Sequence, residues 1–224
     1  VLSVKGAIAP ASADYLVRGL AKAAEASARL VVIEMDTPGG LDTSMRDIIK
    51  AILASPVPVA TYVSPQGARA ASAGTYILYA SHVAAMAPGT NLGAATPVAI
   101  GIGGDAAKPA EKKAEKDKDS APSGSAMEKK AVHDASAYIR SLAQLRGRNA
   151  EWAERAVRQA ESLSAEEAAK LKVVDFIADD LTDLLRQADG RRVKLAAGEA
   201  TLALAGAVVA DVAPNWKETL LAAI

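Results

Sequence analysis

The segment ARLVVIEMD, residues 28–36, constrains the fold more than any other part of the sequence. It is a nearly continuous apolar run, and DTPGG (36–40) closes it. A run of this kind is typical of a parallel strand that is covered on both faces. We therefore expect layers of helix on a parallel sheet, which is an α/β fold.

Strand and helix signals alternate through the first half of the chain. Pro10 is expected to open a helix, because proline is favoured at the first helical position. Asp42 or Thr43 is expected to cap the next helix. Further strands are predicted at the N-terminus, at 56–63 and within 81–89, with an apolar helix after Ser72.

The second half begins with a segment, 101–126, that contains almost nothing to bury. We interpret it as a flexible loop or lid, and a passive linker is an equal alternative. Helices are predicted at 127–145 and 150–161, and SAEE (164–167) is a capping box for another. A strand at 173–178, a short helix and a hairpin turning at Ala197–Gly198 complete a single domain over 1–224.

Composition excludes several classes of function. The 26 basic and 26 acidic residues balance, which argues against a nucleic-acid partner. There is no cysteine and there are only two histidines, so a thiol nucleophile and a Cys-rich or His-rich metal site are excluded. The chain begins at Val1 and ends on NWKETLLAAI, so we expect it to be a fragment of a longer protein.

Ser72 is the first candidate for chemistry, because it stands among small residues in AASAG. At a helix start its hydroxyl would lie near free backbone N–H groups and the positive end of the helix dipole. Such groups suit a developing oxyanion. The alternative is that the small residues only let two backbones pack closely.

The turn DTPGG is the second candidate, because α/β folds place ligand sites at the carboxyl ends of strands. Its glycines, Gly39 and Gly40, allow unusual backbone angles and can expose N–H groups. The alternative is an ordinary turn between strand and helix.

A nucleophilic serine needs a base. His82 and His133 are each interpreted as structural, since His82 would lie roughly 15 Å from Ser72 on a helix. Lys129 and Lys130 stand where the loop becomes a helix, and periodicity does not choose between them. If Asp134 paired with Lys130, it would hold that lysine charged.

Collinear motifs resemble the NfeD family of membrane-bound serine proteases of the ClpP class, encoded beside stomatin-like proteins. The motifs are DTPGG, PVPVATYVSPQGARAASAGTYI, SHVAAMAPGTNLGAATP and KAVHDASAYIRSLAQLRGRN, and the match covers nearly the whole chain. The resemblance implies a ClpP/crotonase-like fold of stacked β-β-α units. It also implies a Ser-Lys dyad of Ser72 and Lys130, and an oxyanion hole from Gly39 or Gly40 with Ala73.

The resemblance further implies a hydrophobic substrate segment, such as the C-terminal region of a stomatin homologue, and a homodimer without metal or cofactor. The parent protein would be anchored in a membrane, with this domain on the extracytoplasmic side. VAAMAPG and LGAATPVAIGI are expected either to line the substrate pocket or to pack in the core. Arg69 and the long 101–126 loop depart from the family pattern. Alternatives are a signal-peptide-peptidase-like protease, a silent stomatin-binding scaffold and an acyl-CoA enzyme of the crotonase type.

Overall fold

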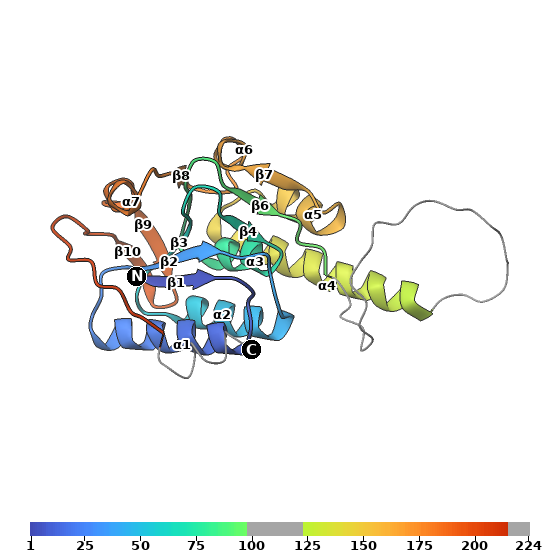
Figure 1. Ribbon diagram of the computed structural model, residues 1–224, viewed down its shortest axis with the longest axis horizontal. Helices are drawn as coiled ribbons and strands as arrows, with labels where there is room; N and C mark the ends of the chain where they lie inside the picture. The colour runs from blue at the N-terminus through green and yellow to red at the C-terminus, as the bar shows by residue number, and fades with distance from the viewer. Residues whose placement is uncertain (98–122, 215–224) are drawn as a thin grey trace.

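The computed structural model describes residues 1–97 and 123–214. Its centre is a parallel five-stranded sheet in the order β1-β2-β3-β5-β8 (Figure 1). The strands are β1 (Leu2–Lys5), β2 (Val31–Asp36), β3 (Val59–Val63), β5 (Val83–Met86) and β8 (Phe176–Ile177).

Strand β2 lies inside this sheet, with β1 on one side and β3 on the other. Ile33 is level with Leu2 of β1 and with Thr61 of β3. Side chains alternate between two cores: Ile33 and Met35 join the larger one, and Val32 joins the smaller one. The prediction from the continuous apolar run, a parallel strand covered on both faces, is therefore confirmed.

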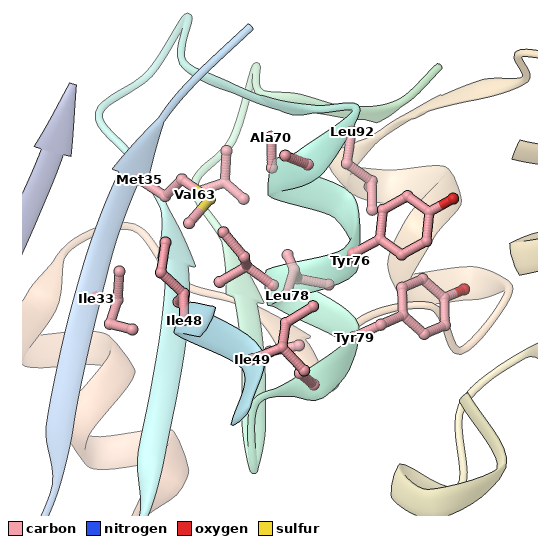
Figure 2. Packing of buried hydrophobic residues seen from close by; sticks show 14 of the residues in the cluster. Ile33, Met35, Ile48, Ile49, Val63, Ala70, Tyr76, Leu78, Tyr79 and Leu92 are labelled. Atoms are coloured by element: carbon pink, nitrogen blue, oxygen red, sulfur yellow. The ribbon is translucent and has the colours of Figure 1, made fainter. Parts of the chain in front are cut away.

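Helices α1 (Pro10–Glu25), α2 (Asp42–Ala54) and α3 (Ala73–Ala80) contribute to the larger core. Figure 2 shows Ile48 and Ile49 of α2 packing with Ile33, Met35 and Leu78. The smaller core on the other face is covered by α7 (Leu181–Ala188) and by the hairpin of β9 (Arg192–Leu195) and β10 (Gly198–Thr201). The predicted layers of helix on sheet are confirmed.

A second sheet of three strands, in the order β4-β6-β7, carries the segment before Ser72. Its strands are β4 (Arg69–Ala71), β6 (Asn91–Gly93) and β7 (Ser162–Ser164). The chain therefore runs from β3 in the main sheet to β4 in the second sheet and then into α3. This is a β-β-α unit of the predicted kind.

The remaining helices are α4 (Ser123–Arg146), α5 (Ala150–Arg158) and α6 (Ala165–Lys170). The first turns of α4 extend beyond the body of the molecule, whereas its second half packs on α3 and α5 (Figure 1). The predicted capping box at α6 is present, with reciprocal bonds between Ser164 and Glu167. Within the described ranges, no helix is long and apolar enough to span a membrane.

Several boundaries differ from the predictions, among them the end of α5, which is Arg158 rather than residue 161, and the bounds of β8, which are Phe176–Ile177 rather than 173–178. Helix α4 begins at Ser123, so the predicted loop 101–126 overlaps it, and residues 101–122 lie outside the described residues. Leu41, not Asp42 or Thr43, is the N-cap of α2, and its amide donates to the carbonyl of Ile8 at 2.8 Å. Gly198 pairs with Leu195, so the hairpin turns one residue earlier than predicted.

Candidate active site

Ser72 lies at the junction of β4 and α3, where the predicted helix start is confirmed. It is the N-cap residue of α3, with φ 50° and ψ −116°, and its side chain makes no capping hydrogen bond. A non-glycine residue in such a conformation costs about 1–3 kcal/mol. The surrounding structure must therefore hold it there.

Hydrogen bonds on both sides of Ser72 supply that constraint. Its amide donates to the carbonyl of Gly93 in β6 at 2.9 Å, and its carbonyl accepts from the amide of Thr75 at 2.9 Å. The hydroxyl of Thr75 donates to the carbonyls of Ala70 at 2.8 Å and Gly93 at 3.1 Å. These bonds tie the first turn of α3 to the second sheet. The hydroxyl of Ser72 is left free for other contacts.

The DTPGG turn lies directly against Ser72. A Cβ atom added to Gly39, whose φ is 115°, would be 2.6 Å from the Cβ of Ser72 and 3.0 Å from its Oγ. Glycine is thus required at position 39 for two reasons: its positive φ, and the space that the absent side chain leaves beside Ser72. The structure brings together two motifs that are about 30 residues apart in the chain.

The two glycines of this turn use their amides differently. The amide of Gly39 donates to the hydroxyl of Thr37 at 3.1 Å. In the described part of the chain, no hydrogen bond is donated by the amide of Gly40 or of Ala73. A Cβ on Gly40 would lie 2.0 Å from the carbonyl oxygen of Ile8, so this glycine is also needed for close backbone packing.

Thr37 and Thr75 were not predicted as site residues, although each holds backbone beside Ser72. Thr37 is fully buried, and its hydroxyl also donates to the carbonyl of Gly39 at 3.1 Å. A threonine that begins a tight turn and bonds two residues onward is a recognised turn signal. That signal is present in the sequence DTPGG.

Part of the small-residue segment serves packing. A Cβ on Gly74 would lie 2.6 Å from the Cγ2 of Thr37 and 3.3 Å from the Sδ of Met35. The segment VAAMAPG also belongs to the core, because Val83 to Met86 form a central strand with almost no exposure. Of the two alternatives for VAAMAPG, packing in the core is the one that the structure shows for Val83–Met86. Arg69 is exposed at the start of β4, and nothing in the structure explains its side chain.

Lys130 is exposed on the first half of α4, as is Lys129. Among the described residues, no hydrogen bond or ion pair involves the side chain of Lys130, and none joins it to Ser72. The carboxylate of Asp134 instead accepts from the guanidinium of Arg46 at 2.7 Å. The pairing of Asp134 with Lys130 considered from the sequence is not formed.

Contacts between α3 and α4 fix which face of α4 is turned inward. The ring of Tyr138 stacks on that of Tyr76 of α3, with 6.2 Å between the ring centroids. The guanidinium carbon of Arg46 of α2 lies 4.4 Å from the centroid of the Tyr138 ring. Figure 2 shows Tyr76 pointing away from the strands of the main sheet. Counting back along the helix at about 100° per residue, Lys130 lies about 80° around the axis from Tyr138, and Lys129 about 180°.

The two histidines have structural positions, as predicted. His82 is 8% exposed, and its Nδ1 accepts from the amide of Val59 at 3.1 Å. Burial, with the charges of Arg146 and Arg148, lowers its pKa to about 3. His133 is exposed and lies 3.4 Å from a nitrogen of Arg158. Within residues 1–97 and 123–214, no cluster of acidic or histidine side chains could hold a metal ion.

Comparison with known proteins identifies relatives of this chain. A model of the NfeD1b N-terminal domain matches residues 1–197. The membrane-bound protease PH1510 of Pyrococcus horikoshii is 37% identical over 228 residues, which is 100% of this chain and 47% of that protein. The membrane protein NfeD1b of Bacillus subtilis is 40% identical over 99 residues, 44% of this chain and 22% of that protein.

Solved structures of similar proteins have the same fold as this chain. One is the 1510-N membrane-bound stomatin-specific protease, as a lysine-to-alanine mutant in complex with a substrate peptide. It has a TM-score of 0.82 and 35% identity, over 99% of this chain and 94% of that chain. A serine-to-alanine mutant of the same protease has a TM-score of 0.82 and 36% identity, over 96% of each chain. The α/β fold of the ClpP/crotonase type is confirmed, and this chain spans about half of PH1510.

Proposed function

This chain belongs to the NfeD1b N-terminal domain family, and on that premise we propose that it is a serine endopeptidase with a Ser-Lys dyad. Ser72 is the nucleophile and Lys130 is the general base. The observation that carries the proposal is the backbone of Ser72, with φ 50° at the start of α3. A non-glycine residue held in such a conformation by its neighbours is a feature that concentrates at active sites.

The oxyanion hole is assigned to the amides of Gly40 and Ala73. Both lack an acceptor in the described structure, whereas the amide of Gly39 is already bonded to Thr37. Gly39 contributes differently, because its missing side chain leaves room beside the Oγ of Ser72. Two donors that are fixed before the reaction stabilise a developing negative charge without reorganisation.

The choice of Lys130 over Lys129 is supported by the phase of α4. Lys130, Asp134 and Tyr138 follow one another at intervals of four residues along α4. Asp134 and Tyr138 both contact Arg46, which lies near the start of α2. The start of α2 follows the Gly39–Gly40 turn directly. Lys129 points to the opposite side from Tyr138. Because Lys130 is exposed here, its action as a base requires that bound substrate or a second protomer covers it.

The proposed reaction has two halves. Neutral Lys130 takes the proton of the Ser72 hydroxyl as the Oγ attacks the peptide carbonyl, and the amides of Gly40 and Ala73 hold the oxyanion. Lys130 then donates the proton to the leaving amine, which leaves an acyl-enzyme. Water, deprotonated by Lys130, hydrolyses the acyl group and restores Ser72.

The substrate class follows from the relatives, one of which is named a stomatin-specific protease. We propose that this chain cleaves a hydrophobic segment of a membrane-associated protein, such as the C-terminal region of a stomatin homologue. The parent protein would be anchored in a membrane with this domain on its extracytoplasmic side, and the domain would act as a homodimer. The single domain over 1–224 belongs to the same proposal.

Cleavage of a fluorogenic peptide from a stomatin C-terminal region tests this proposal. Ser72→Ala and Lys130→Ala are each expected to lower kcat/KM by at least about a thousandfold while the protein remains folded. Lys129→Ala is the matched control, because it removes the neighbouring exposed lysine, and it should retain activity. A fluorophosphonate probe should label the native chain and not the Ser72→Ala variant.

Three results would count against the proposal. Normal cleavage by Ser72→Ala would exclude the nucleophile, and equal losses for Lys129→Ala and Lys130→Ala would exclude the assignment of the base. A native chain that bound the peptide without cleaving it or reacting with the probe would instead be a binding scaffold. A peptide carrying a signal sequence, assayed in parallel, distinguishes the two substrate classes.

A further inference from the structure

A polar cavity lies at the opposite end of α3 from Ser72, about 12 Å away along an eight-residue helix. Its volume is about 590 Å³, and His82 and Arg146 form part of its wall. The other side is supplied by Arg191, which precedes β9, and by Arg192 and Lys194 of β9. None of these residues belongs to the proposed peptidase site, so the cavity needs its own explanation.

The hydrogen bonds of His82 fix its tautomer. Its Nδ1 lies 3.1 Å from the amide nitrogen of Val59, and an amide can only donate, so Nδ1 carries no proton. A neutral imidazole then carries its proton on Nε2. The nearest partner of Nε2 is a guanidinium nitrogen of Arg146 at 3.3 Å, which is also a donor. Two N–H groups therefore face each other at the wall of the cavity, and neither accepts.

Arg146 is held in this position by backbone. Its Nε donates to the carbonyl of Ala80 at 2.8 Å, and its Nη1 donates to the carbonyl of Lys194 at 2.9 Å. Its Nη2, which faces His82, has no acceptor in the described part of the chain. Burial and Arg148 lower the pKa of Arg146 only to about 10, so the guanidinium is charged at neutral pH.

The carboxylates around the cavity do not neutralise it. The carboxylate of Asp175 accepts from Arg148 at 2.8 Å and from the amide of Ala84 at 2.7 Å. A guanidinium nitrogen of Arg191 lies 4.0 Å from the same carboxylate. Glu199 of β10 is the other acid on the wall, and it is exposed. Five cationic side chains, Arg146, Arg148, Arg191, Arg192 and Lys194, therefore surround or adjoin two carboxylates.

We propose that this cavity binds a phosphate group, one of whose oxygens accepts from both the Nε2 of His82 and the Nη2 of Arg146. A phosphate oxygen supplies the acceptor that the two facing donors lack, and guanidinium groups are the preferred partners of phosphate. Arg192 and Lys194, whose side chains are exposed at the mouth, add positive charge for the remaining oxygens. The volume also leaves room for the molecule that carries the phosphate, either a soluble phosphate ester or a lipid headgroup.

Because the chain has only two histidines, ¹⁵N spectra of the imidazole rings report on this site directly. Without phosphate, His82 should show the tautomer protonated on Nε2. Titration with inorganic phosphate at constant pH and ionic strength should move the His82 Nε2 resonance to saturation. His133 is exposed and lies 13 residues before Arg146 on α4, which is about 20 Å along the helix axis. It should show no saturable change, and a His133→Gln variant assigns the two signals.

The double variant Arg192→Gln/Lys194→Gln should weaken phosphate binding by about tenfold, because it removes two charged contacts and leaves the backbone bond of Lys194 intact. Lys22→Gln/Lys50→Gln, on exposed positions of α1 and α2, is the control with the same change in net charge. The two sources are separated by glycerol phosphate in the same titration, and by sedimentation with phosphatidylcholine vesicles with and without phosphatidylglycerol.

Saturable binding of either source that the Arg192→Gln/Lys194→Gln variant weakens supports the site. The proposal is overturned if His82 is protonated on Nδ1. It is also overturned if neither inorganic phosphate, glycerol phosphate nor anionic vesicles bind, or if both double variants bind alike.

Discussion

Gly39→Ala is the substitution that tests most directly how the DTPGG turn and Ser72 depend on each other. The new Cβ would lie 2.6 Å from the Cβ of Ser72, so the two must move apart by about 1 Å to reach ordinary contact. A misplacement of about 1 Å in a reacting group can cost roughly a hundredfold in rate. The φ of 115° adds a backbone cost of about 1–3 kcal/mol for any residue with a side chain.

Gly67→Ala separates the two effects. Gly67 also has a positive φ, 85°, but a Cβ there would meet nothing within 4 Å. In each variant the positive φ should cost about 1–3 kcal/mol in the free energy of unfolding, measured with denaturant. Only Gly39→Ala should also lose about a hundredfold in the rate of fluorophosphonate labelling and of peptide cleavage. If Gly39→Ala reacted as fast as Gly67→Ala, the contact between the turn and Ser72 would not govern the nucleophile.

Three further predictions concern stability. Ser72→Gly should be more stable than Ser72→Ala by about 1 kcal/mol in denaturant unfolding, because only glycine adopts φ 50°, ψ −116° without strain; equal stabilities would contradict the strain. The folded chain keeps His82 neutral, with a pKa lowered from 6.5 to about 3. Below about pH 6.5 the unfolded chain therefore binds more protons, so stability falls by roughly 1.4 kcal/mol per pH unit toward pH 3. His82→Asn should flatten that slope, and an unchanged slope would assign it to other groups. Arg148→Met should cost about 3–5 kcal/mol, because it removes the ion pair to Asp175 and leaves the carbonyls of Tyr79 and Ser81 without their side-chain donor. Lys50→Met, which removes an exposed ion pair, is the control and should change the free energy of unfolding little.

Local chemistry explains which elements could be predicted. The apolar run of β2, the proline that opens α1 and the capping box of α6 each act through a few neighbouring residues. The errors arose where a distant segment decides the boundary. Leu41 caps α2 because its amide bonds to Ile8, which is 33 residues away in the chain. No local pattern at Asp42 or Thr43 reports that bond.

The candidate site divides in the same way. AASAG and DTPGG were each identified in the sequence, and for each an ordinary packing interpretation stood beside the catalytic one. In the structure these small residues serve both packing and clearance, because Gly74 packs on Thr37 while Gly39 leaves space at Ser72. Whether a small residue serves packing or clearance depends on what lies opposite it, which spacing along the chain does not contain.

The sequence by itself determined the α/β class, the helix start at Ser72 and the family, because burial patterns and motifs are carried by consecutive residues. Only the tertiary structure decided that Asp134 binds Arg46, that the amide of Gly39 is occupied while that of Gly40 is free, and that His82 faces Arg146 with no acceptor between them. Each of these contacts joins side chains or amides of separate elements at hydrogen-bond distance. Such contacts form only when the sheets and helices are assembled, so no local sequence pattern contains them.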